Sequence, residues 1–213
     1  MNAATAPIAI VDYGMGNRRS VEKALEHVGA RAVITSSQDE LRSAAGVVVP
    51  GVGAFPRAME NLRAARLDTV LVELVRSGVP TLGICLGMQL ALDGSDELGG
   101  AEGLGLVAGR VRRLDSGDAK LPHIGWNEVR FERSSALTET LPERGAFYHV
   151  HSYAARPEDP ADVLATADYG TTFVTAIARG AFYGVQFHPE KSSTLGLRLL
   201  AAFASLCRAG VPA

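Results

Sequence analysis

A cysteine stands between two glycines in the segment Gly83-Ile84-Cys85-Leu86-Gly87, directly after the short apolar run 81–84. This arrangement is typical of a nucleophile elbow, a sharp strand-to-helix turn usually written G-x-S-x-G, here with sulfur in place of oxygen. The glycines relieve crowding in a turn that would strain other residues. A chain with this turn must place a strand and a helix in succession, as α/β folds do.

The same alternation of short apolar runs and helical patterns fills the first half of the chain. Continuous apolar runs are typical of strands that are covered on both faces. Strand-helix alternation predicts an open, mostly parallel sheet flanked by helices. Strands are expected at 8–11, 32–35, 47–49 and 81–84, and helices at 20–28, 55–63, 68–76 and 86–92.

After Gly99 the pattern changes to short strands and turns, which indicates antiparallel additions in the C-terminal half. A last helix is predicted over 194–208, and no internal repeat or linker interrupts the chain, so 1–213 is expected to be a single domain. The strands of this half are expected at 107–114, 128–131, 146–153, 163–167, 173–178 and 183–187.

Composition excludes several classes of function. Of the 213 residues 47% are apolar and 21% charged, and the net charge is −2, as in ordinary globular domains. The basic residues are dispersed, which argues against nucleic-acid binding. The N-terminal segment predicts neither a signal peptide nor a membrane span. Two cysteines, Cys85 and Cys207, form no disulfide framework or metal site, so we expect a reducing cytoplasm.

A second motif, His188-Pro189-Glu190, supplies the partners that a cysteine nucleophile needs. It follows a predicted strand, so the histidine should lie at the same sheet edge as Cys85. The imidazole can act as base and acid, and Glu190 can fix its tautomer. A buried thiol in a tight turn and a structural histidine are the alternatives. The pairing of the two motifs favours thiol-dependent acyl transfer.

A third strand-end element is Pro50-Gly51-Val52-Gly53. Its two glycines allow peptide N–H groups to turn into a concave anion site, which suggests an oxyanion hole opposite the elbow. A phosphate cradle is the rival interpretation. Neither of the common phosphate-binding glycine patterns is present in this segment.

Taken together, these blocks resemble class I glutamine amidotransferases and, within them, the glutaminase-subunit family of imidazole glycerol phosphate synthase. The resemblance implies the flavodoxin-like fold of that class, and it extends in order and spacing along nearly the whole chain. The stretches that carry it are 12–17 (Asp-Tyr-Gly-Met-Gly-Asn), 50–55 (Pro-Gly-Val-Gly-Ala-Phe), 83–89 (Gly-Ile-Cys-Leu-Gly-Met-Gln), 122–127 (Pro-His-Ile-Gly-Trp-Asn), 151–153 (His-Ser-Tyr) and 184–192 (Gly-Val-Gln-Phe-His-Pro-Glu-Lys-Ser).

The resemblance implies hydrolysis of glutamine to glutamate and ammonia through a thioester on Cys85, with His188 and Glu190 completing a triad. It implies no metal and no cofactor. Ammonia would pass to a cyclase subunit that makes imidazole glycerol phosphate and an aminoimidazole carboxamide nucleotide in histidine biosynthesis. The other implied roles are oxyanion stabilisation by Val52, Gly53 and Leu86, glutamine binding by Gln89, Glu97, His151, Ser152 and Tyr153, and cyclase contact by Asn17, Trp126, Asn127, Tyr148 and Lys191.

Alternatives remain at this point. Trp126 and Tyr148 can be core aromatics, and Lys191 a solvated charge. Glu97 lies in a stretch that departs from the family's pattern. The glutaminase of another synthase, such as the one that makes pyridoxal phosphate, and a catalytically silent binding module on the same fold are the rival functions. For an active glutaminase, we expect low activity without the cyclase and its nucleotide, with the loop 50–53 realigned on assembly.

Overall fold

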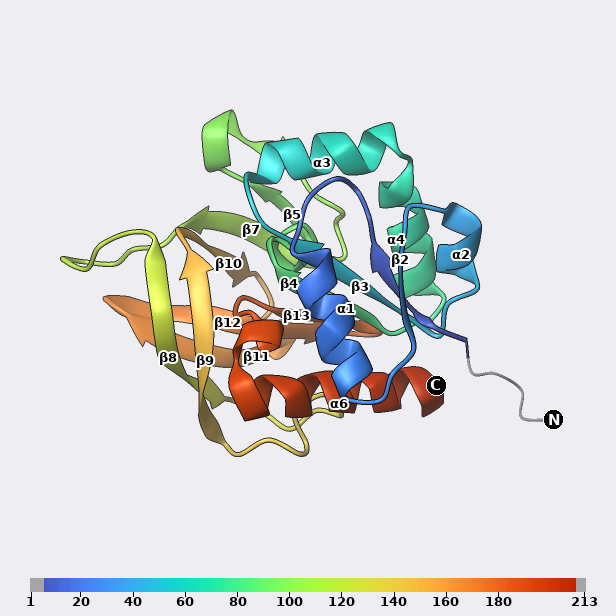
Figure 1. The fold of residues 1–213 in the computed structure, drawn as a ribbon. Helices are drawn as coiled ribbons and strands as arrows, with labels where there is room; N and C mark the ends of the chain where they lie inside the picture. Colours follow the sequence, from blue (N-terminus) through green and yellow to red (C-terminus); the bar gives the residue numbers. More distant parts are fainter. Residues whose placement is uncertain (1–5, 210–213) are drawn as a thin grey trace.

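The computed structural model describes residues 6–209 of the chain. Its centre is a parallel sheet in the order β2-β1-β3-β4-β13. These strands are, in that order, Ala32–Thr35, Ile8–Val11, Gly46–Gly51, Thr81–Cys85 and Phe182–Val185. The predicted parallel sheet is therefore present (Figure 1).

Helices cover this sheet on both faces. Strand β1 shows why: Ile8 and Ile10 pack into one apolar cluster with the helices α1 (Arg18–His27) and α6 (Ser193–Ala209). Ala9 and Val11 point the other way, into a second cluster. Alternate residues of a strand face opposite sides, so a continuous apolar run requires cover on both. The second cluster is formed with α2 (Gln38–Arg42), α3 (Phe55–Ala64) and α4 (Leu67–Arg76).

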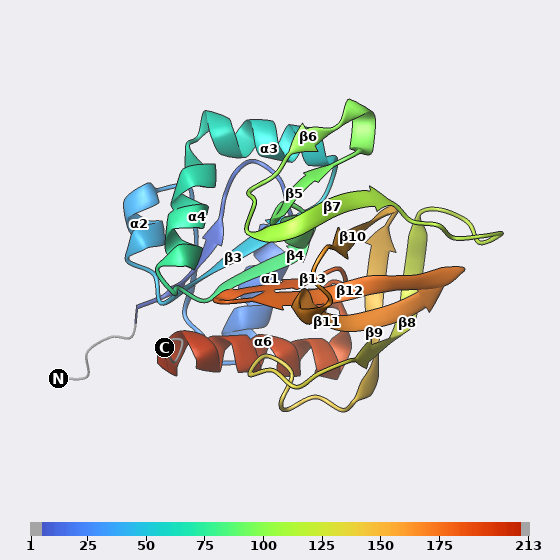
Figure 2. The same cartoon turned by 180° about the vertical axis from the view of Figure 1, so that it is seen from behind.

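The C-terminal half extends the sheet with antiparallel strands, as expected (Figure 2). Strand β12 forks: it pairs with β13 and β10 along the main sheet, and with β11 on a branch that continues through β8 to β9. The bounds are β5 Leu92–Ser95, β6 Ala101–Glu102, β7 Val107–Arg113, β8 His123–Phe131, β9 Arg144–His151, β10 Tyr153–Pro157, β11 Val163–Tyr169 and β12 Thr171–Arg179. Short 3-10 turns are η1 Glu97–Gly99, η2 Pro160–Asp162 and η3 Pro189–Lys191.

Two expected elements were wrong. The helix expected over 86–92 ends early: α5 covers only Leu86–Gln89, and Leu92 already lies in β5, paired with Val107. A short apolar run fits a helix and a strand equally well, and the tertiary pairing decides between them. The run expected as one strand over 146–153 is two strands, because β9 pairs with β8 whereas β10 pairs with β7. Among residues 6–209, no helix combines the length and apolar character needed to cross a membrane.

Candidate active site

Cys85 occupies the strained corner that the glycine pattern predicted. It ends β4 with φ 54° and ψ −110°, a backbone conformation that non-glycine residues rarely adopt. A Cβ at Gly87 would lie 1.8 Å from the carbonyl oxygen of Val49, so only glycine lets α5 lie against β3. Because α5 is a single turn, its dipole at the sulfur is smaller than a full helix would supply.

His188 and Glu190 form the next part of the site. The turn η3 brings the Glu190 carboxylate back to the imidazole, with Oε1 3.0 Å from Nδ1, and both side chains are almost fully buried. Burial by itself lowers the pKa of His188. Hydrogen bonds to Cys85 and Glu190, together with the negative charge of both groups, outweigh burial and raise this pKa to about 10. The raised pKa favours a protonated His188 imidazole in the neighbourhood of the Cys85 sulfur.

The loop 50–53 lies beside the elbow. Gly51 is opposite Cys85 in the β3–β4 register, and a Cβ at Gly51 would be 2.7 Å from the Cβ of Leu86. Gly53 follows at φ 105°, which favours glycine. The backbone of Val52 and Gly53 thus borders the same space as Leu86, where an oxyanion hole needs its N–H groups.

A cavity of about 280 Å³ opens above the sulfur. That volume is near the lower end for ligand sites and suits a small molecule. Its walls bring together the predicted catalytic cysteine and histidine, the predicted oxyanion residues and all the predicted glutamine-binding residues; Glu190 lies behind His188. The lining residues are Val52, Gly53, Cys85, Leu86, Gln89, Glu97, Pro122, Val150, His151, Ser152, Tyr153, His188 and Lys191.

Two polar side chains in this wall are held by the protein itself. Glu97 accepts a hydrogen bond from the backbone N–H of Phe55 at 2.8 Å, at the start of α3. Gln89 donates through Nε2 to the carbonyl of Tyr153 at 3.0 Å and to Oε1 of Gln186 at 2.9 Å. Both hydrogens of this nitrogen are thereby used, so Oε1 is the atom that Gln89 can offer to a ligand.

Three histidines lie together at this wall, and we call them the histidine cluster: His151 lines the cavity, and His123 and His149 lie behind it. His123 Nδ1 is 3.0 Å from His151 Nε2, and His149 Nε2 is 2.8 Å from the hydroxyl of Thr175. Burial lowers the pKa of each of the three, to about 3 for His149 and about 4 for His151. Within the part of the chain that the structure describes, no His, Cys, Asp or Glu group is arranged to hold a metal ion.

The predicted cyclase contacts do not all share one face. Trp126 is 56% exposed and meets Tyr148 edge to face at 6.1 Å, and the Lys191 ammonium lies 5.9 Å from the Tyr148 ring. Asn127 points to the other side of β8, where it donates to the carbonyl of Asp168 at 2.9 Å. Asn17 is on a separate element and precedes α1, which packs against η3.

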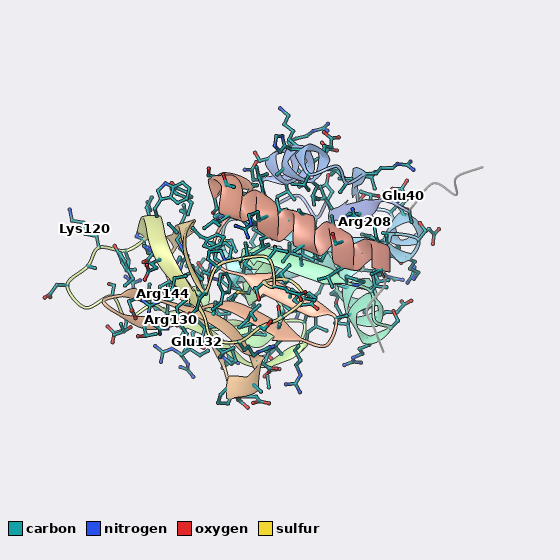
Figure 3. All side chains as sticks on the ribbon, turned by 90° about the horizontal axis from the view of Figure 1, so that it is seen from below. Glu40, Lys120, Arg130, Glu132, Arg144 and Arg208 are labelled. Atoms are coloured by element: carbon teal, nitrogen blue, oxygen red, sulfur yellow. The ribbon has the colours of Figure 1, made fainter. Side chains whose placement is uncertain are left out.

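Along β8, the outer face divides into an apolar part and a charged part. Ile124 is 60% exposed beside Trp126, at the end of the strand near the cavity. Towards the other end, Arg130 pairs with Glu132 at 3.0 Å, and Arg144 of β9 lies next to them (Figure 3). We call Ile124, Trp126, Tyr148 and Lys191 the docking patch. Exposed apolar patches with a polar rim are typical of interaction sites.

The sequence interpretation missed several site residues. Gln186 donates through Nε2 to Cys85 Sγ at 3.5 Å, and the Val150 carbonyl lies 3.8 Å from the same sulfur. A signal for Gln186 was present: it stands two residues before His188, and residues two apart on an extended chain share a face. Val150 contributes only a backbone oxygen, for which the side-chain pattern holds no signal.

Comparison with known proteins identifies the class. The family model described as "Glutamine amidotransferase class-I" matches residues 9–205, which contain the elbow, the loop 50–53 and the histidine-glutamate pair. The chain belongs to this class. Its relatives make the assignment narrower: it is 49% identical over 95% of its length to the imidazole glycerol phosphate synthase subunit HisH of Moorella thermoacetica, and 48% identical over 95% to that of Bacillus cereus, with 96% of each relative covered. Within the class it belongs to the HisH glutaminase subunits.

The fold agrees with this assignment. The structure of PurLQS from Thermotoga maritima superposes with a TM-score of 0.74 over 94% of this chain and 99% of that one, at 19% identity. The fold class and the family predicted from the motifs are confirmed, and so is the enzyme class. The relatives favour this family over the pyridoxal phosphate glutaminase and over a silent binding module.

Proposed function

We propose that Cys85, His188 and Glu190 hydrolyse glutamine and that the ammonia is delivered to a cyclase subunit in histidine biosynthesis. The observation that carries the proposal is the His188 imidazole, held between the Glu190 carboxylate and the Cys85 sulfur beneath a cavity of about 280 Å³. The family supports the substrate, since its members are glutamine amidotransferases.

The reaction follows from the positions of these groups. The Cys85 sulfur attacks the carboxamide carbon of glutamine, and the carbonyl oxygen becomes negatively charged towards the loop 50–53. The imidazolium of His188 gives its proton to the leaving nitrogen, and the C–N bond breaks. Ammonia departs, and a glutamyl thioester remains on Cys85. His188 then removes a proton from water, which attacks the thioester. The C–S bond breaks, glutamate leaves, and the sulfur and imidazolium are restored.

The amino-acid end of the substrate would lie against Gln89 and Glu97. Glu97 carries a carboxylate, and Gln89 has only Oε1 left to offer, so both suit the α-ammonium group rather than the α-carboxylate. The stretch 151–153 lines the opposite wall and would hold the carboxylate end.

The docking patch would meet the cyclase. It combines an exposed tryptophan and isoleucine with a lysine, and it lies beside the mouth of the cavity, where released ammonia must leave. Aromatic anchors of this kind are typical of interface centres. Asn17 and Asn127 would support this contact from neighbouring elements. We expect the complex in a reducing cytoplasm, where the Cys85 thiol stays unpaired.

The test is a glutamine hydrolysis assay on the full chain, alone and with the cyclase and its nucleotide ligand. We expect turnover that both additions stimulate, no turnover by Cys85→Ala, and full turnover by Cys207→Ser. Trp126→Ala should weaken cyclase binding by about tenfold or more, whereas Glu40→Ala on distant α2 should not. A complex that never produces glutamate, or a Cys85→Ala variant that still does, would overturn the proposal.

A further inference from the structure

The side chain of Gln186 lies next to the nucleophile at the edge of the parallel sheet. Val185 of β13 is opposite Ile84 of β4, so the residues that follow them, Gln186 and Cys85, leave the sheet side by side. Gln186 is fully buried, and its Nε2 lies 3.5 Å from Cys85 Sγ. We propose that Gln186 is a positioning residue that orients the Cys85 sulfur and stabilises it as a thiolate. This rests on the proposed function of Cys85.

The direction of this hydrogen bond is determined by its neighbours. The carbonyl of Tyr153 can only accept, so the atom of Gln89 that meets it at 3.0 Å must be the nitrogen. The same nitrogen lies 2.9 Å from Gln186, which must therefore present its oxygen there. The other end of the Gln186 amide is then the NH₂ group, and it donates to the sulfur. The Tyr153 carbonyl thus orients the Gln186 amide towards Cys85 through the side chain of Gln89.

A donor on the sulfur from this side complements His188. The His188 imidazolium, whose pKa Cys85 and Glu190 raise, must give its proton to the departing ammonia. The Gln186 amide keeps its hydrogens through the whole cycle, so it can stabilise the thiolate when the thioester breaks. Hydrogen bonds to a charged acceptor are stronger than neutral ones, and sulfur accepts well only as thiolate.

The arrangement also connects the sulfur with the substrate wall. Gln89 lines the cavity and holds the oxygen of Gln186. A ligand that meets Gln89 therefore contacts the side chain that fixes the amide on Cys85. Replacing Gln186 should change the acidity and the reactivity of the sulfur, because within residues 6–209 the side-chain partners of the amide are Gln89 and Cys85 alone.

The experiment measures the rate at which iodoacetamide alkylates Cys85 in the full chain as a function of pH. Gln186→Met keeps the length of the side chain and removes the donor, and the pH midpoint should rise by about one unit. Gln186→Glu can still accept from Gln89 but presents negative charge to the sulfur, and it should raise the midpoint further. If one of these two variants does not fold, the other still tests the proposal.

Thr175→Val is the matched control, because Thr175 is buried nearby but bonds His149 instead of the sulfur. Its midpoint should equal that of the unaltered chain. A second measurement needs no change at position 186: the Gln186 side-chain amide proton resonance should move in Cys85→Ala. An unchanged or lower midpoint in both Gln186 variants, or a static resonance, would overturn the proposal. Alkylation requires no glutamine, so it decides the role of Gln186 even if glutamine hydrolysis were absent.

Discussion

The buried active-site histidine and the histidine cluster lie close together in this molecule, and their pKa values shift in opposite directions. His188 in the active site has its pKa raised to about 10, whereas His149 in the histidine cluster has its pKa lowered to about 3. Burial lowers both. The partners differ: the Glu190 carboxylate and Cys85 raise the pKa of His188, whereas the hydrogen-bond partners of His149 within residues 6–209 are a backbone carbonyl and the Thr175 hydroxyl.

An anionic partner, and not the degree of burial, therefore decides the protonation state of a buried imidazole here. In the active site, the buried Glu190 carboxylate lies beside His188, the histidine that must carry a proton. The histidine cluster, with neutral partners, stays uncharged and can pack tightly, as the stacking of His123 on Tyr169 at 4.0 Å shows. His151 is the member of the cluster that lines the cavity.

The strongest way to break the contrast is to remove the carboxylate with Glu190→Gln. The imidazole would lose one of the two partners that raise its pKa, so this pKa should fall, and kcat for glutamine should fall by about 10³–10⁴-fold. Steady-state hydrolysis in the presence of the cyclase measures kcat, and NMR titration measures the pKa of His188. A loss smaller than about tenfold in a folded variant would show that Glu190 does not set the state of His188.

The sequence predicted the three catalytic residues but not the histidine cluster. Cys85, His188 and Glu190 lie in short motifs after predicted strands, and parallel strands bring such ends to one edge whatever the details of packing. The histidine cluster depends on the pairing of β8 with β9 and on the hydrogen bond between His149 of β9 and Thr175 of β12. These contacts join residues far apart in the chain. Within a single extended run, β9 pairs with β8 whereas β10 pairs with β7. Local pattern carries no information on such pairings, so the environment of His149 could not be predicted.

Acid stability offers the next test, with an effect of a few kcal/mol. The folded pKa values of His149 and His151 are about 3 and 4, below the ordinary 6.5, so between about pH 6.5 and pH 4 the unfolded chain binds more protons. Stability must therefore fall as the pH drops, by roughly 1.4 kcal/mol per unit for each histidine at most. His188 has the opposite sign: its contribution is complete below pH 6.5 and is lost as the pH rises through about 10.

The double variant His149→Phe, Thr175→Val removes one of these groups together with its hydroxyl partner. Between pH 6.5 and pH 5 its urea midpoint should depend on pH less steeply than that of the unaltered chain, because His123 and His151 remain. Most carboxylates are ionised in this window, so the slope reports mainly on the histidines. An unchanged slope would assign the acid sensitivity to other groups.

The smallest expected effect concerns the link between His123 and His151. His151 Nδ1 lies 2.9 Å from the carbonyl of Tyr153 and must carry the hydrogen there, so its Nε2 accepts from Nδ1 of His123. His123→Phe keeps a ring on Tyr169 but removes this donor. The free energy of unfolding should fall by about 1–2 kcal/mol, since a buried acceptor loses its partner. Because the cluster carries no charge into the reaction, kcat should change by less than about threefold. Urea unfolding measures the free energy of unfolding, and steady-state hydrolysis measures kcat. A large loss of kcat without loss of stability would show that His123 takes part in the reaction, contrary to the contrast between His188 and the histidine cluster.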